Sequence, residues 1–243
     1  MIANARVPAL LRRSIVLAAA DGSPPMRSSS SAALAPTDLA RYGTMVPPMP
    51  HHLDITHWHH RLCPVTDGIV VSGDLHEDPK RAAHQLEQWR QSGITHVLDT
   101  RSEWSDKGLV AKHAPDLAYG WFGTDDDGSP QPDAWFDDGL AFAAEALHEP
   151  DAVLLVHCHM GINRGPSMAY RILLERGWDP IEALDAIRAA RPIADIGYAG
   201  DALDHYHRHH SVPASQRMLD RDRLEAWRRG YPTTGLHLMR PND

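Results

Sequence analysis

The segment from 152 to 176 constrains the fold of this 243-residue chain more than any other part. A short apolar run, Ala152-Val153-Leu154-Leu155-Val156, predicts a buried strand, and the stretch from Pro166 to Arg176, stopped by Gly177, predicts a helix. The loop between them contains Cys158 and, six positions later, Arg164. Such a loop must curl tightly, so that the N–H groups opening the helix point inward at an anion.

Cysteine and arginine at this spacing suit phosphoryl chemistry. A free thiol has a pKa near 8.5, and a helix N-terminus, converging N–H groups and a guanidinium can lower that pKa by several units. Arg164 can hold two phosphoryl oxygens with its planar fork, and Gly161 lets the backbone approach the ligand. The expected reaction is thiolate attack on phosphorus, followed by hydrolysis of the cysteinyl-phosphate. The alternative is that Cys158 is an inert buried cysteine at the end of a strand.

The pattern His-Cys-x-x-Gly-x-x-Arg at 157–164 resembles the signature of the cysteine-dependent protein tyrosine phosphatase superfamily, and within it the dual-specificity-like branch. The resemblance covers roughly residues 66–195, and no cofactor is expected. It implies that Cys158 is the nucleophile, that Arg164 clamps the phosphate and that His157 helps to tune the thiolate. The implied phosphate cradle consists of His159, Met160, Gly161, Ile162, Asn163 and Arg164.

One position departs from the family pattern. Members usually carry serine or threonine directly after the arginine, where the hydroxyl assists the departure of the cysteine, but this chain has Gly165. Ser167 lies two residues further on, and we expect it to face elsewhere. The departure predicts slower release of the phospho-intermediate, or the use of another donor.

The general acid is expected in the run Asp125-Asp126-Asp127-Gly128-Ser129-Pro130, since expelling an alkoxide or phenoxide needs a proton donor. Members of the family carry the general acid about thirty residues before the cysteine. The Asp-x-Gly-x-Pro pattern of their acid loops favours Asp126, then Asp127, then Asp125. Adjacent carboxylates also raise one another's pKa, which suits an acid. The alternative is a solvated acidic turn, because Asp-Gly is common in turns.

Strands and helices alternate from about residue 66, which predicts an α/β domain with a central mixed, mostly parallel sheet and helices on both faces. Further strands are expected at 67–72, 94–98 and 117–122. Helices are expected after Asp78-Pro79, from Asp133 and after Asp179-Pro180. This order places the site at the C-terminal end of the last strand.

Arg101 ends a segment, 94–101, that resembles the family's strand and turn beside the catalytic loop. It could brace that loop or the substrate, but we favour a surface ion pair. Residues 197–229 look helical and carry no evident chemistry.

Three parts are expected along the chain: a disordered tail at 1–50, rich in proline and serine, a catalytic domain at 51–210, and a helical extension with a loose end at 211–243. The apolar run after Arg12-Arg13 is too short for a persuasive export signal.

The net charge of −8 argues against nucleic acid or an anionic membrane as the main partner. Among seventeen histidines two clusters stand out, at 51–60 and 205–210, but no cysteine or carboxylate completes a convincing ligand set, so no metal is expected. Only Cys63 accompanies Cys158, which is consistent with a reducing cytoplasm. Nothing in the sequence shows that the two meet in a protective bridge.

We therefore expect a phosphatase acting on phosphotyrosine, and in addition on phosphoserine or phosphothreonine, in proteins. A silent phosphopeptide-binding module, supported by Gly165, is the first alternative. A rhodanese-like sulfurtransferase or an arsenate reductase is the second, since these also use a cysteine in an anion-binding loop. The oligomeric state does not follow from the sequence.

Overall fold

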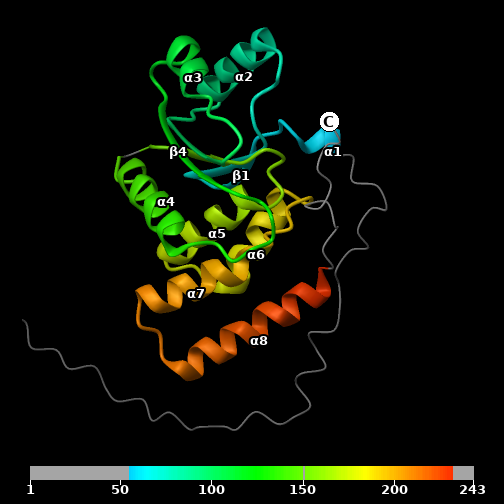
Figure 1. The fold of residues 1–243 in the computed structure, drawn as a ribbon, viewed down its shortest axis with the longest axis vertical. Coiled ribbons are helices and arrows are strands. Elements are labelled where there is room, and N and C mark those ends of the chain that lie inside the picture. Colours follow the sequence, from blue (N-terminus) through cyan, green and yellow to red (C-terminus); the bar gives the residue numbers. More distant parts are fainter. Residues whose placement is uncertain (1–54, 150, 232–243) are drawn as a thin grey trace, which may run out of the picture. The chain divides into compact units, whose positions relative to one another are not determined.

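A five-stranded sheet organises the part of the chain that the computed structural model describes, residues 55–149 and 151–231 (Figure 1). Its strands are β1 (Cys63–Thr66), β2 (Ile69–Ser72), β3 (His96–Arg101), β4 (Ala118–Thr124) and β5 (Leu154–His157), in the spatial order β1-β2-β5-β3-β4. Strands β2, β5, β3 and β4 run parallel, whereas β1 pairs antiparallel with β2 at one edge. The predicted mixed, mostly parallel sheet is confirmed.

Helices cover both faces of this sheet (Figure 1). In the described ranges they are α1 (Ile55–Trp58), α2 (Pro79–Gln91), α3 (Lys107–His113), α4 (Asp133–Ala146), α5 (Arg164–Glu175), α6 (Pro180–Ala190), α7 (Ala199–His209) and α8 (Ala214–Gly230). Side chains alternate between the two faces of a strand. Leu154 and Val156 therefore pack with α4 to α8, and Leu155 packs with α2 and α3. The result is a single α/β domain with two hydrophobic layers.

Two aspartates begin helices as the sequence predicted. The side chain of Asp78 accepts hydrogen bonds from the first backbone N–H groups of α2, and Asp179 does the same for α6. A proline follows each aspartate in the first turn, where a missing N–H costs nothing.

Three elements differ from the prediction. Helix α5 begins at Arg164 rather than Pro166, and α3 was not predicted. The expected helix at 197–229 is two helices, α7 and α8, because the chain turns at 210–213. Leu224 and Trp227 of α8 belong to the same core as α5, so this segment is part of the domain's packing. None of the described helices is long and apolar enough to cross a membrane. The tail predicted at 1–50 lies outside the described residues, as do His51, His52 and residues 232–243.

Strand β5 is buried along its whole length between β2 and β3. Its last residue, His157, pairs in register with Ser72 of β2 and Asp99 of β3. Whatever follows β5 therefore emerges at the middle of the sheet's C-terminal edge, where ligands bind in open α/β sheets.

Candidate active site

The loop from Cys158 to Arg164 joins the end of β5 to the first turn of α5. Cys158 is only 2% exposed, and both Asn163 and Arg164 are 3% exposed, so the loop is packed into the domain rather than free at its surface. The burial places a thiol and a guanidinium together in a site where water competes little for an anion.

The carbonyl oxygens of four consecutive loop residues all bind groups outside the loop. They accept hydrogen bonds as follows: His159 from Asp74 N (3.0 Å), Met160 from Arg191 Nη2 (2.7 Å), Gly161 from Arg191 Nε (2.6 Å) and Ile162 from Asp195 N (2.7 Å). In a trans peptide the N–H points opposite to the carbonyl. The N–H groups of residues 160–163 therefore face the inside of the loop, as an anion cradle requires.

Two glycines allow the loop to close this tightly. Gly161 has φ +62°, and a Cβ there would lie 2.4 Å from the carbonyl oxygen of Ser72. A Cβ at Gly165 would lie 3.0 Å from the carbonyl carbon of His157 and 3.1 Å from the nitrogen of Cys158. The position after the arginine is thus packed against the backbone that carries the cysteine. Any larger residue there needs that backbone to shift.

Arg164 is hydrogen-bonded at one edge, and at the other its Nε has only an ion pair with Asp126 within the described part of the chain. Its Nη1 and Nη2 donate to the two carboxylate oxygens of Glu103, at 2.7 and 2.8 Å, and Nη1 also donates to the carbonyl of Thr124 at 3.0 Å. Its buried Nε has no hydrogen-bond partner among the described residues. Burial alone would lower the pKa of Arg164, but Glu103, Cys158 and Asp126 together raise it. A permanently charged fork therefore keeps its Nε–Nη2 edge for a ligand.

Of the three candidate acids, Asp126 is the one that reaches Arg164. Its Oδ2 lies 3.5 Å from Arg164 Nε, and its Oδ1 accepts hydrogen bonds from Asn163 Nδ2 (2.6 Å) and the Tyr198 hydroxyl (2.9 Å). Burial raises the pKa of Tyr198 to about 12, which keeps that hydroxyl protonated. With Oδ1 occupied by two donors, Oδ2 is the oxygen that can carry a proton toward the cradle.

The other two aspartates of the run point elsewhere. Asp125 accepts a hydrogen bond from the hydroxyl of Ser102 at 2.7 Å. Asp127 is exposed and accepts hydrogen bonds from the backbone and the hydroxyl of Ser129, as in an ordinary turn. The Ser102–Asp125 contact ties the segment after β3 to the segment after β4, so these two segments wall the cradle on adjoining sides.

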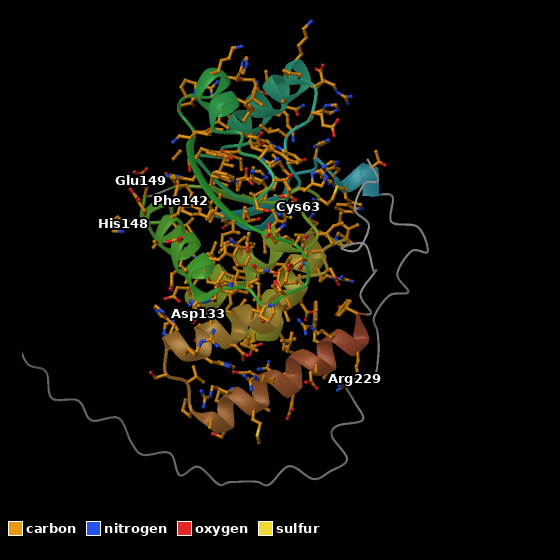
Figure 2. The ribbon with its side chains drawn as sticks, in the orientation of Figure 1. Cys63, Asp133, Phe142, His148, Glu149 and Arg229 are labelled. Atoms are coloured by element: carbon orange, nitrogen blue, oxygen red, sulfur yellow. The ribbon has the colours of Figure 1, made fainter. Side chains whose placement is uncertain are left out.

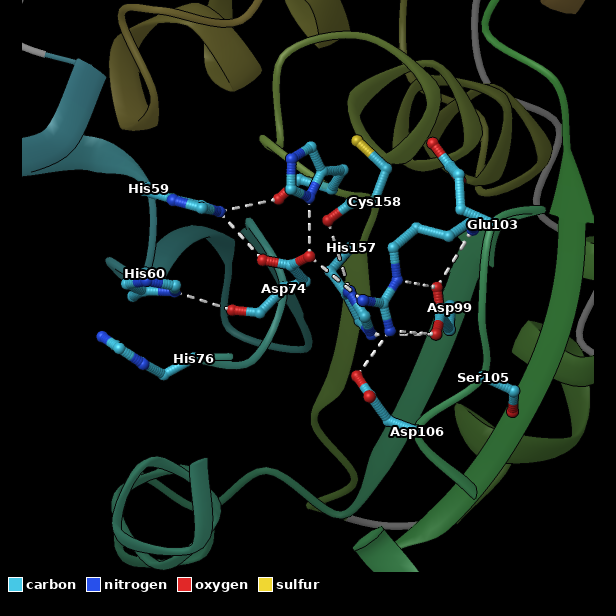
Figure 3. A network of polar contacts seen from close by, with 12 residues as sticks. His59, His60, Asp74, His76, Asp99, Glu103, Ser105, Asp106, His157 and Cys158 are labelled. Atoms are coloured by element: carbon cyan, nitrogen blue, oxygen red, sulfur yellow. Dashed lines mark hydrogen bonds and ion pairs between the residues drawn. The ribbon is translucent and has the colours of Figure 1, made fainter. Parts of the chain in front are cut away.

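A buried polar network supports the cradle from beneath (Figure 3). Asp74, 2% exposed, accepts hydrogen bonds from His159 Nδ1 (2.7 Å), His59 Nε2 (2.8 Å) and Arg101 Nη1 (3.1 Å). The hydrogen bond to Asp74 raises the pKa of His159, against the effect of burial. Burial would raise the pKa of Asp74, but its histidine partners and Arg101 lower it. The first cradle residue therefore carries positive charge more readily than a free histidine.

Arg101 is a centre of this network and not a surface residue, so the favoured surface ion pair was wrong. It is fully buried and forms a bidentate pair with Asp99 (2.9 and 2.6 Å), with further bonds to Asp74 and Asp106 (2.5 Å). It is linked to His159 of the cradle through Asp74, which binds both side chains.

Two further predicted supporting residues occupy defined places. His157 is buried at the end of β5, with Nε2 3.8 Å from Asp99 Oδ2. Ser167 is buried in α5, and its hydroxyl oxygen accepts a hydrogen bond from the backbone N–H of Tyr198 (3.2 Å), at the start of α7. Its oxygen is thus engaged on the side of α7.

Three groups of side chains among the described residues have ligand atoms within 4.8 Å of one another: His59–His60–Asp74, Glu175–His209–His210 and Asp99–Asp106–His157. However, the Asp74 carboxylate already binds Arg101, and a guanidinium beside it opposes a cation. In the histidine cluster at 205–210, His205 pairs with Asp137 and His207 with Asp220. These histidines hold helices together.

Both cysteines are free thiols. Cys63 is buried on β1, inside the domain (Figure 2), and its sulfur accepts a hydrogen bond from Arg191 Nη1 at 3.4 Å.

Solved structures with a similar fold include dual-specificity and tyrosine phosphatases. A variant of human DUSP28 is 20% identical, covering 63% of this chain and 98% of its own, with a TM-score of 0.51. A mouse putative dual specificity phosphatase complexed with zinc tungstate is 19% identical, covering 62% and 89%, with the same TM-score of 0.51. PTPMT1 is 16% identical, covering 62% and 97%, again with a TM-score of 0.51. The chain has the fold of the cysteine-dependent protein tyrosine phosphatase superfamily.

No protein-family model matches the sequence, and neither does the sequence of any curated protein. The phosphatase fold is therefore recognised through its structure, and the motif at 157–164 lies where that fold brings the end of a central strand to a helix.

Four residues around the cradle of this phosphatase fold were missed by sequence reasoning: Glu103, Asp74, Arg191 and Tyr198. Each belongs to a segment distant from Cys158, and Glu103 is separated from Arg164 by 61 positions. Only a weak sequence pattern pointed to any of these four residues. Glu103 and Asp74 both lie shortly after predicted strands, at the sheet edge where the site was expected.

Proposed function

We propose that this protein is a phosphatase that hydrolyses phosphotyrosine, and in addition phosphoserine or phosphothreonine, in protein substrates. The observation that carries the proposal is the way in which the two edges of the Arg164 guanidinium are bound. Glu103 and Thr124 hold its far edge, while the Nε–Nη2 edge is buried, charged and directed toward Asp126. This edge of the planar guanidinium fits two oxygens of a phosphoryl group. The inward N–H groups of residues 160–163 can then bind the remaining oxygens.

The first step transfers the phosphoryl group to the enzyme. The Cys158 thiolate attacks phosphorus and forms an S–P bond while the bond between phosphorus and the ester oxygen breaks. Asp126, protonated on Oδ2, gives its proton to the leaving oxygen, so that tyrosine or serine departs as the neutral alcohol. Arg164 and the loop N–H groups hold the equatorial oxygens, whose charge they stabilise throughout.

The second step hydrolyses the cysteinyl-phosphate. Water attacks phosphorus, Asp126 takes back a proton from that water, and the S–P bond breaks to release phosphate and the thiolate. Gly165 offers no hydroxyl to the departing sulfur. The inward N–H groups and Arg164 remain to stabilise it. A thiolate nucleophile requires reducing conditions, so we propose the cytoplasm as the compartment.

The test is hydrolysis of an aryl phosphate by the full chain and two variants. Cys158→Ser should abolish turnover while still binding tungstate, because the cradle remains. Asp126→Asn should slow the reaction about 100- to 10,000-fold, the usual contribution of a positioned acid. Asp127→Asn is the matched control and should change the rate little, since its carboxylate is bound to Ser129. Full activity in Cys158→Ser would end the proposal.

A second candidate is a phosphopeptide-binding module, which Gly165 favours because the usual hydroxyl is missing. A burst of one product per enzyme, without turnover, and retained phosphopeptide affinity would support it. A thiosulfate assay run in parallel tests for sulfurtransferase activity.

A further inference from the structure

A large aromatic side chain stands exposed beside the cradle. Trp104, in the segment between β3 and α3, is 45% exposed, although it sits next to Glu103, which binds Arg164. Its ring meets the ring of His159, the residue after Cys158, edge to face, with centroids 5.5 Å apart and planes at 74°. The indole is therefore at the rim of the cradle, on the segment 102–104, which adjoins the segment that carries Asp126.

This indole is held in place rather than loosely attached. The guanidinium carbon of Arg101 lies 4.8 Å from its ring centroid, and Arg101 is itself fixed by Asp99, Asp74 and Asp106. A cation over one face of an indole attracts it electrostatically. Glu103 anchors the neighbouring residue through its pair with Arg164. A fixed aromatic ring needs little ordering when a ligand packs against it.

The direction of the leaving group follows from Arg164 and Asp126. Its guanidinium lies between Glu103 on one edge and Asp126 on the other, and Ser102 and Asp125 link the two walls. Asp126 has to reach the leaving oxygen to protonate it, so the ester group of a phosphate in the cradle lies toward the segment 125–128, which the Ser102–Asp125 contact joins to the segment 102–104. An aromatic ring on that ester would reach the rim where Trp104 stands, whereas a serine ester places only a short alkyl chain there.

We propose that Trp104 determines the specificity of the site, packing against the ring of an aryl phosphate and so favouring phosphotyrosyl over phosphoseryl substrates. This inference rests on the proposed phosphatase function. Offset or edge-to-face aromatic pairs add stabilisation beyond that of buried area alone. The preference is therefore expected to depend on an aromatic ring at position 104 and not merely on an apolar one.

The experiment compares kcat/KM on matched phosphotyrosyl and phosphoseryl peptides for wild type, Trp104→Phe, Trp104→Leu and Trp104→Ala. The tyrosyl-to-seryl ratio should fall about tenfold in Trp104→Ala, fall partly in Trp104→Leu and stay close to wild type in Trp104→Phe. The loss should appear mainly as a higher KM for the phosphotyrosyl peptide. Trp121→Ala is the matched control. Trp121 is 48% exposed on β4 and donates its indole N–H to the carbonyl of Arg101.

A second measurement removes any dependence on turnover. Phenylphosphonate and methylphosphonate are titrated as inhibitors or, in a chain that binds without turnover, as ligands. Trp104→Ala should weaken the phenyl compound about tenfold and the methyl compound little. An unchanged ratio in both measurements, or an equal loss for both members of each pair, would overturn the inference. If the wild type instead hydrolyses neither peptide, the proposed function fails while the phosphonate comparison still decides the role of Trp104.

Discussion

Two fully buried arginines stand behind the cradle, and their charges are balanced in different ways. Arg101 is surrounded by the carboxylates of Asp74, Asp99 and Asp106. Arg191 donates to the carbonyls of Met160 and Gly161, and to the sulfur of Cys63. Among the described residues no carboxylate pairs with Arg191. Arg101 is thus part of a neutralised ionic network, whereas Arg191 brings uncompensated positive charge to the cradle's outer side.

The surroundings shift the pKa values of the two guanidinium groups in opposite directions. Burial lowers the pKa of Arg191, with only the two thiols opposing it. Burial acts on Arg101 too, but its three aspartates raise its pKa well above the ordinary range. The difference indicates separate tasks. Arg101 stabilises the fold beneath the rim, and Arg191 fixes the loop carbonyls while its charge favours an anion in the cradle.

Arg101→Met should give the largest loss of stability in the molecule. It leaves three aspartates in a buried site without their cation, and breaking a buried pair in this way costs about 3–5 kcal/mol. Urea unfolding followed by circular dichroism measures the change. Arg208→Met is the control, because Arg208 pairs with Asp133 at the surface, at the start of α4 (Figure 2), and both side chains are more than half exposed. That variant should lose less than about 1 kcal/mol. Equal losses in the two variants would contradict the role given to Arg101.

Arg191→Met should affect anion binding more than stability. Its hydrogen bonds to loop carbonyls are each worth about 1 kcal/mol net, and the new side chain relieves a buried charge, so we expect a loss of about 1–3 kcal/mol in unfolding free energy. Tungstate affinity, measured by calorimetry, should fall about tenfold or more because a nearby positive charge is gone. Arg191→Lys keeps the charge without the fork and should recover part of that affinity. An unchanged tungstate affinity in Arg191→Met would show that the charge of Arg191 does not favour an anion in the cradle.

Features that are continuous in the chain could be predicted from the sequence. The loop at 157–164 is continuous in the chain, so strand, cysteine, glycine and arginine could be read together, and the sheet, α2 and α6 followed from apolar periodicity and caps. From the sequence, Gly165 predicts only the loss of a hydroxyl group. Its packing against His157 and Cys158 depends on the folded loop.

Residues that act across the sheet could not be found in this way. Asp74 and His159 are 85 positions apart, and Asn163 and Asp126 are 37 apart, so neither contact leaves a local pattern. Arg101 was misjudged because an arginine ending a strand is usually exposed, and only the convergence of three aspartates from separate segments allows it to be buried. The choice of Asp126 stays a prediction, now with its contacts to Arg164 and Asn163 in support.

The smallest effect is expected at the link between the network and the cradle, where Asp74 meets His159. The pKa of His159 is raised above its ordinary 6.5, so the stability it contributes is fully present below about pH 6.5 and is lost as pH rises through the raised value. The pKa of Asp74 is lowered below its ordinary 3.8, so its contribution is present above about pH 4 and is lost only as pH falls through the lowered value.

The pair should therefore stabilise the fold most between about pH 4 and 6.5 and less above that range. His59, Arg101 and Glu103 also face this pair, and they stay in place in both variants used to test it. In Asp74→Asn and in His159→Gln, urea unfolding between pH 6 and pH 9 should show a flatter pH dependence than wild type, by about 1 kcal/mol or less because His159 is partly exposed. A wild-type slope retained in both variants would mean that the charge on His159 does not depend on Asp74, and that the ionic network ends at Arg101 without reaching the cradle.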